Sequence, residues 1–132
     1  MIGMWSVHSA SFLYFAGIGI IIALAPMALW PLQWARLIGW SIPADNHLAV
    51  YYGRCLACVA CAVGAFAVVA ADRPVLVAFY FPVLLTSWML MVAVHAYGAV
   101  RKIQPIGETY EIALWAGLVV LTLLFWPNVA AD

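Results

Sequence analysis

The chain has 132 residues, of which 69% are hydrophobic and only 8% carry a charged side chain, and its mean hydropathy is +1.11. So few polar side chains cannot cover the surface of a water-soluble protein of this size, and the composition predicts an integral membrane protein in a lipid bilayer. The five basic and five acidic side chains balance one another. Because no positive field results, nucleic-acid binding is excluded.

Four long apolar runs follow one another along the chain, at about 9–30, 48–71, 75–99 and 108–126. Each is long enough for one helical crossing, whereas the strands of a membrane barrel would be short segments of alternating polarity. Short breaks that contain proline, glycine or charged residues separate the runs. The pattern predicts an all-α membrane protein, a four-helix up-and-down bundle in which residues 1–132 form a single integral membrane domain.

The first apolar run is interpreted as a retained helix, because no Lys or Arg precedes Arg36 and no convincing cleavage site follows. Arg36, Arg101 and Lys102 lie in the first and third breaks, whereas the second break holds only Arg73. The positive-inside rule then predicts that loops one and three are cytoplasmic and that both termini lie on the non-cytoplasmic side. A bacterial-type inner (plasma) membrane is the expected location.

The fourth run is too short to cross a membrane with apolar residues alone. The stretch 112–126 has only 15 residues, whereas a spanning helix needs roughly 20. Glu108 and Glu111 are therefore predicted to lie at or inside the boundary of the hydrocarbon. A carboxylate there needs a partner, a proton, water or a helix N-terminus to stabilise it.

Arg54 is predicted to enter the same boundary. If it were excluded from the second helix, only the 17 residues of 55–71 would remain to cross the membrane. A buried cation and a carboxylate at similar depth lower each other's desolvation cost. We therefore predict an ion pair between Arg54 and one glutamate, with Glu111 as the favoured partner.

Polar and aromatic residues on the third and fourth predicted helices recur at the spacing of one helix face. Glu108, Glu111 and His95 are candidate catalytic groups for proton transfer, although a purely structural role for each stays open. Trp88 and Trp115 lie far from the interfaces where tryptophan usually sits, so they are predicted to line a cavity. The candidate ligand-binding residues are Arg54, Trp88, Met91, Trp115, Tyr97 and Tyr110.

The cysteines do not predict a metal site. Cys55, Cys58 and Cys61 are spaced three apart, so the first and last point about 120° apart on a helix, whereas zinc sites usually take cysteine pairs from tight turns. No metal site is therefore expected. Haem bound through a single histidine, His95 or His47, stays open as an alternative, because small membrane bundles can hold haem.

Small residues at four-residue spacing predict a surface on which another helix can approach closely. On the second predicted helix these residues are Gly53, Ala57, Cys61 and Ala65, and Gly19 and Ala23 offer a matching surface on the first. The same stripe, with exposed aromatic residues, would suit association into a homo- or hetero-oligomer with other membrane helices.

Two functions compete on this sequence. The first is a non-catalytic subunit or assembly partner within a membrane complex, because four short-looped helices leave little soluble surface. The alternative is a lipophilic-ligand-binding protein or isomerase-type enzyme that uses an inner-face Arg/His/Glu cluster for proton transfer on a hydrophobic substrate. A proton or solute pathway ranks third, since the outer half has few polar residues. Motifs for phosphate binding and for serine or zinc hydrolases are missing.

Overall fold

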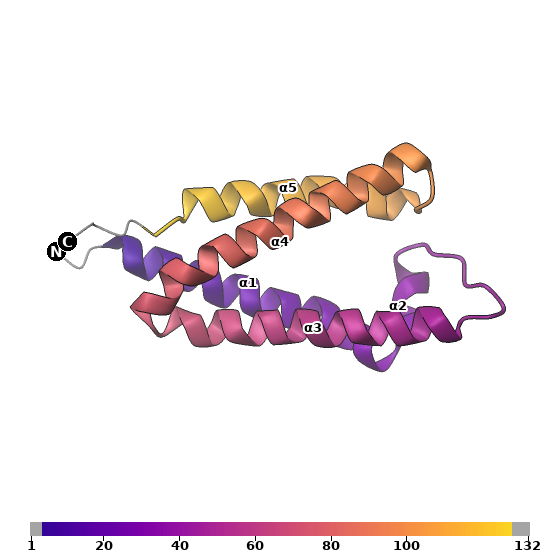
Figure 1. Cartoon of the computed structure of the whole chain (residues 1–132), viewed down its shortest axis with the longest axis horizontal. Helices are drawn as coiled ribbons and strands as arrows, with labels where there is room; N and C mark the ends of the chain where they lie inside the picture. Colours follow the sequence, from indigo (N-terminus) through magenta and orange to yellow (C-terminus); the bar gives the residue numbers. More distant parts are fainter. Residues whose placement is uncertain (1–3, 128–132) are drawn as a thin grey trace.

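The computed structural model describes residues 4–127, with side chains from His8 onward, and is all-helical over that range. Figure 1 shows α1 (Met4–Leu29), α2 (Pro31–Leu37), α3 (His47–Ala71), α4 (Pro74–Arg101) and α5 (Ile106–Leu124). All but α2 are long and apolar enough to cross a membrane. The prediction of a four-helix membrane protein is confirmed, and each spanning helix overlaps the apolar run from which it was predicted.

The short helix α2 was not predicted. It has 7 residues and begins with Pro31, a residue favoured at the first position of a helix because it lacks an N–H group and its φ is already helical. The Trp34 backbone N–H bonds the Trp30 carbonyl across the junction with α1 at 3.0 Å. The Trp34 indole N–H also donates to the Ala23 carbonyl at 3.0 Å, so α2 is held against the end of α1.

The four long helices form two antiparallel pairs, α1 with α3 and α4 with α5 (Figure 1). Although α3 and α4 follow one another in the sequence, they pack against each other much less than either packs in its own pair. Arg73 between them adopts an extended conformation, and Pro74 begins α4. The pairs lie close together at this turn and farther apart toward α2 (Figure 1).

The contact between α1 and α3 is closest at two glycines. A Cβ atom added to Gly17 would lie 2.5 Å from the Gly64 carbonyl oxygen, and one on Gly64 would lie 2.7 Å from the Gly17 oxygen. In the predicted small-residue stripe Ala57 is buried, but the last member Ala65 is exposed and Gly19 faces open space. A spacing of four residues turns by about 40° per step around a helix, so the stripe leaves the contact face.

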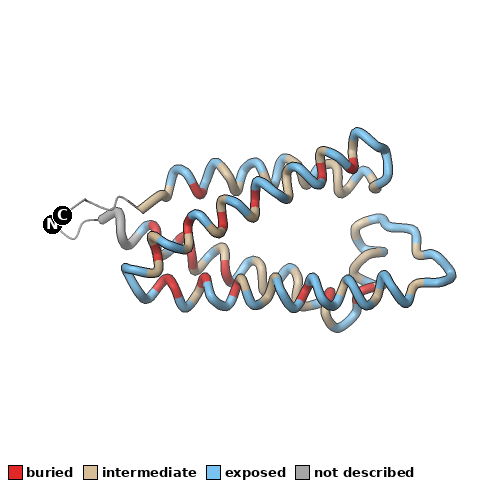
Figure 2. Tube along the Cα trace, in the orientation of Figure 1, coloured by how far each residue is buried: buried red, intermediate tan, exposed pale blue. Residues whose placement is uncertain are grey.

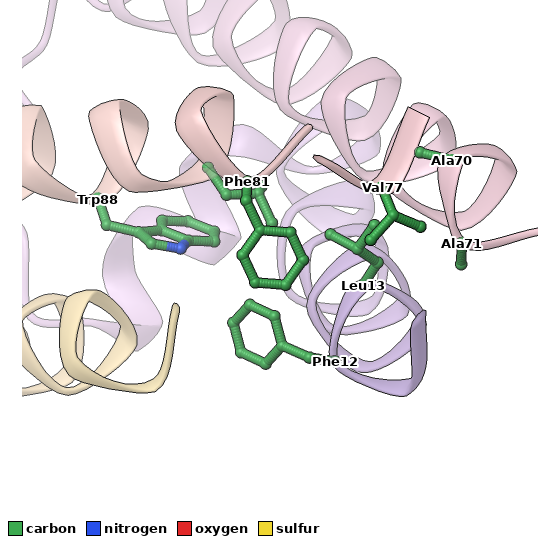
Figure 3. Close-up of a cluster of buried hydrophobic side chains, with 8 residues drawn as sticks. Phe12, Leu13, Ala70, Ala71, Val77, Phe81 and Trp88 are labelled. Atoms are coloured by element: carbon green, nitrogen blue, oxygen red, sulfur yellow. The ribbon is translucent and has the colours of Figure 1, made fainter. Parts of the chain in front are cut away.

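The apolar core lies at the end of the bundle near the α3–α4 turn. Phe12 packs between the ring of Phe81, at 5.6 Å between centroids, and the ring of Phe125, at 5.5 Å. The Ser9 hydroxyl donates a hydrogen bond to the Phe125 carbonyl at 2.8 Å, which links the start of α1 to the end of α5. The buried members are Phe12, Leu13, Ala70, Ala71, Val77, Phe81, Leu84 and Trp88, most of them shown in Figure 3. Figure 2 shows buried positions along the facing sides of the helices.

Adding one methyl group to each of two α1 glycines should have opposite effects on stability. Gly17→Ala is expected to lower the free energy of unfolding by about 1–3 kcal/mol, because its Cβ collides with the α3 backbone. Gly19→Ala, where nothing lies within 4 Å, should leave it unchanged or raise it by up to about 1 kcal/mol, since alanine favours a helix. Denaturation in detergent measures both variants, and equal effects would contradict the predicted helix contact.

Candidate functional site

Glu108, Glu111 and His95 meet between α4 and α5 near the α2 end of the bundle. His95 Nε2 lies 2.9 Å from Glu108 Oε2 and 3.5 Å from Glu111 Oε2, and one nitrogen or oxygen atom from each residue lies within 4.8 Å of the others. The His95 side chain is buried, and the carboxylates are 14% and 28% exposed. The three side chains that were predicted as candidate proton-transfer groups thus form one polar cluster.

A tight turn brings these residues together. Lys102 adopts the left-handed conformation with φ 53°, and its N–H bonds the Ala99 carbonyl while the Ile103 N–H bonds the Gly98 carbonyl, both at 3.1 Å. These two hydrogen bonds form a Schellman motif, which ends α4 and reverses the chain. The last turns of α4 therefore face the first turns of α5, and His95 faces the two glutamates.

Gln104 joins the two helices behind the cluster. Its side-chain N–H₂ donates to the His95 carbonyl at 3.0 Å and to the Thr109 hydroxyl at 3.2 Å. A Cβ atom on Gly98 would collide with the Gln104 amide, so an alanine there would displace this side chain from its position across α4. The sequence analysis missed Gln104, because a loop residue carries no helical periodicity.

The backbone of α4 fixes the orientation of the His95 ring. His95 Nδ1 lies 2.8 Å from the Met91 carbonyl oxygen, and a carbonyl can only accept, so Nδ1 carries the hydrogen and donates it. Nε2 is then the nitrogen that faces the two carboxylates. Met91, predicted to bind a ligand through its side chain, contributes its backbone carbonyl to the site. Because Nε2 and the carboxylate oxygens are all acceptors, a proton or a cation must lie among them.

Trp40 brings a loop to the cluster from the other helix pair. Its indole N–H donates to Glu108 Oε1 at 2.8 Å. Gly39, with φ +97°, gives the loop a turn that other residues rarely adopt, and a Cβ atom on Gly107 would lie 2.9 Å from the Ile38 carbonyl oxygen. The sequence analysis missed this role of Trp40, because a contact across 68 residues leaves no spacing signal.

An open cavity of about 410 Å³ lies beside the cluster, between the loop after α2 and the start of α5. Glu111 is the only charged residue in its wall. The other lining residues are apolar or glycine, namely Leu37, Ile38, Gly39, Pro105, Ile106 and Gly107. An apolar cavity with a single carboxylate is suited to a lipophilic molecule that has one polar end.

Two tryptophans extend from the cluster toward the apolar core. The Trp115 ring lies 5.9 Å from the His95 ring, and Trp88 stacks on Trp115 with 5.5 Å between ring centroids. Within the described part of the chain, the buried indole N–H of Trp88 has no hydrogen-bond partner, whereas Trp115 interacts through its side chain with Glu111. Buried donors are rarely left unsatisfied, so an acceptor is expected next to the Trp88 N–H. The predicted cavity-lining role of these two residues stays a prediction.

The predicted ion pair between Arg54 and Glu111 is wrong. No ion pair joins them among the described residues, and Arg54 is exposed on α3. The physical reason is the order of packing, because α3 lies along α1 whereas Glu111 lies on α5, which packs against α4. His95 takes the place of Arg54 as the partner of Glu111.

Three further candidates lie away from the cluster. Tyr97 and Tyr110 are exposed on the outer surface of their helices, so neither lines the cavity beside Glu111. His47 is exposed at the start of α3. Haem on His95 finds no support in this arrangement, because Nε2, the nitrogen that would bind iron, faces two carboxylates.

Comparison of the chain with protein-family models, with curated proteins and with solved structures found no match. One imidazole and two carboxylates, enclosed by aromatic and apolar side chains, can hold a proton or a cation and can present either to a molecule in the adjacent cavity.

Removing the imidazole should lower stability by an amount that depends on whether the two glutamates are charged. His95→Ala is expected to lower the free energy of unfolding by about 1–3 kcal/mol, because two partly buried carboxylates lose their shared partner. Adding Glu108→Gln and Glu111→Gln to His95→Ala should restore part of that loss, since the unpaired charges are then gone. Denaturation in detergent, with the exposed His47→Ala as the matched control, measures each step. A loss equal to that of His47→Ala would contradict the arrangement.

Proposed function

We propose that this protein binds a lipophilic molecule in the cavity beside Glu111 and that the His95–Glu108–Glu111 cluster acts on the polar end of that molecule. The observation that carries the proposal is the single carboxylate in an otherwise apolar wall. That carboxylate belongs to a cluster with an imidazole and a second carboxylate. Apolar cavities with a few convergent polar groups are the usual form of small-molecule sites.

The reaction class that fits this site is isomerisation by proton movement within one molecule, such as a double-bond shift or the opening of an epoxide. Acid–base groups within hydrogen-bond reach of each other can remove a proton at one position and return it at another.

The cluster lies at the end of the bundle that carries Arg36, Arg101 and Lys102, all of them at the surface, whereas the exposed Arg73 lies at the opposite end. On the positive-inside rule, this end faces the cytoplasm and both termini lie on the other side. The site would then open at the cytoplasmic face of a bacterial-type inner membrane, where a lipophilic molecule can enter from the bilayer.

A second candidate function is that of a subunit or assembly partner in a membrane complex. One observation favours it: Thr122 is the only buried residue among the 19 residues of α5. A Cβ atom added to Gly117 on this helix would meet nothing within 4 Å, so another helix could approach α5 closely. A protein that stays monomeric and yields no crosslinked partner in native membranes would count against this function.

Ligand-dependent thermal stabilisation tests the proposed function. A panel of fatty ketones, fatty epoxides and terpenoid alcohols is added to the purified protein in detergent. A binder at about 100 times its Kd should add about 2.7 kcal/mol of stability and raise Tm. Glu111→Gln should reduce this rise, because the polar end of the ligand loses its partner in the cavity wall. Tyr110→Phe, at an exposed neighbouring position, should keep it. Equal rises in wild type, Glu111→Gln and His95→Ala would remove the basis of the proposal.

A further inference from the structure

We infer that His95, Glu108 and Glu111 form a three-ligand site for a divalent transition-metal cation such as Zn²⁺ or Mn²⁺. The ligand atoms would be His95 Nε2 and one carboxylate oxygen from each glutamate. The site rests on the proposed function, because it names the cofactor of the same cluster. With the three side chains bound to the cation, the cluster would act on the same ligand by polarising a carbonyl or epoxide oxygen rather than as free acid–base groups.

Charge balance favours a divalent ion over a proton. The two carboxylates together carry two negative charges, and no Lys or Arg forms an ion pair with either of them among the described residues. One shared proton would neutralise only one of these charges, so protons alone would have to bind at two places, on His95 Nε2 and on one glutamate. A divalent ion with a neutral imidazole neutralises both, which matters at the membrane boundary because an uncompensated charge there is costly.

The spacing of the ligand atoms also fits a single ion. Ligands bound to Zn²⁺ at about 2.0–2.1 Å lie about 3.3 Å apart at tetrahedral angles and about 2.9 Å apart at right angles. The separations from His95 Nε2 are 2.9 Å to Glu108 Oε2 and 3.5 Å to Glu111 Oε2. These two values lie close to the expected range, and the three ligand atoms all lie within 4.8 Å of one another, so a movement of the glutamate side chains would bring all three to one ion.

The hydrogen bonds around the cluster are those that orient metal ligands. A metal-bound histidine usually donates its other N–H to a carbonyl or carboxylate, and a ligating carboxylate usually accepts a hydrogen bond of its own. His95 Nδ1 meets the first requirement through the Met91 carbonyl. Glu108 Oε1 meets the second through the Trp40 indole, which leaves Oε2 turned toward His95. These two hydrogen bonds support a metal site whatever the charge of the cluster.

Three protein ligands leave at least one coordination position open, as in catalytic rather than structural metal sites. Glu111 is the most exposed ligand, with 28% of its side chain accessible, and it forms part of the cavity wall. The unpartnered N–H of Trp88, a residue only 5% exposed, lies two ring contacts away through Trp115. The position of Glu111 in the wall indicates that a molecule in the cavity can reach the ion.

Co²⁺ is the best probe, because its visible absorption reports the ligands. Purified protein is stripped with EDTA in detergent and titrated with Co²⁺, and Zn²⁺ is then added as a competitor. We expect one Co²⁺ per chain, absorption typical of nitrogen and oxygen ligands without a thiolate band, and displacement by Zn²⁺. Replacing all three cysteines, by Cys55→Ser, Cys58→Ser and Cys61→Ser, should leave the affinity unchanged.

Variants of the cluster test which residues bind the ion. His95→Ala, Glu108→Gln and Glu111→Gln should each weaken Co²⁺ affinity by roughly 100-fold or more, and Trp40→Phe, which removes the hydrogen bond to Glu108, by about 10–100-fold. Circular dichroism checks that each variant is folded. If a ligand variant does not fold, Trp40→Phe decides the matter, because it changes only a loop side chain. Unchanged affinity in the folded variants, or no Co²⁺ binding by wild type, would overturn the metal site.

The metal site and the proposed function fail in different ways. The ligand-dependent rise in Tm is measured both with EDTA and with Zn²⁺. Co²⁺ binding without any ligand-dependent rise would overturn the proposed function and support the metal site. A ligand-dependent rise in a protein that binds no Co²⁺ would support the proposed function and overturn the metal site.

Discussion

The contact between the His95 imidazole on α4 and two carboxylates at the start of α5 organises the α2 end of the bundle. Glu108 and Glu111 lie in the first two turns of α5, as the shortness of the apolar stretch after them predicts. His95 Nε2, at 2.9 and 3.5 Å, is the group that meets them. The Schellman turn at Lys102 sets this meeting, since it aligns the last turns of α4 with the first turns of α5.

The two ends of the bundle differ in their contacts: one holds the apolar core, and the other holds the polar cluster. Near the α3–α4 turn, aromatic and aliphatic side chains from α1, α3 and α4 pack with the end of α5 into one apolar core. Toward α2 the helix pairs separate (Figure 1), and the contacts there are polar, from Trp40 and Gln104. A rigid core at one end can therefore hold a site at the other, where an open cavity gives access to Glu111.

Sequence reasoning reaches the elements and part of the site. The length of the fourth apolar run and the helical spacing of polar residues predict Glu108, Glu111 and His95 as site residues. Both signals depend only on the local geometry of a helix, which the sequence states directly. The Arg54 pairing fails because apolar patterns do not state which helices pair, and α3 packs on α1. Trp40 and Gln104 act from loops and have no periodic signal. The helix α2 had a signal that was not used, since Pro31 followed by helix-forming residues is typical of a helix start.

The ¹⁵N NMR spectrum of the His95 imidazole tests the central arrangement most directly. In protein labelled at histidine, Nδ1 should carry a hydrogen, and the Nε2 resonance should shift clearly in Glu108→Gln and in Glu111→Gln, because each carboxylate lies next to that nitrogen. Arg54→Gln should leave it unchanged, since Arg54 is exposed on α3. An Nε2 resonance that ignores both glutamate substitutions, or that responds to Arg54→Gln instead, would contradict the account.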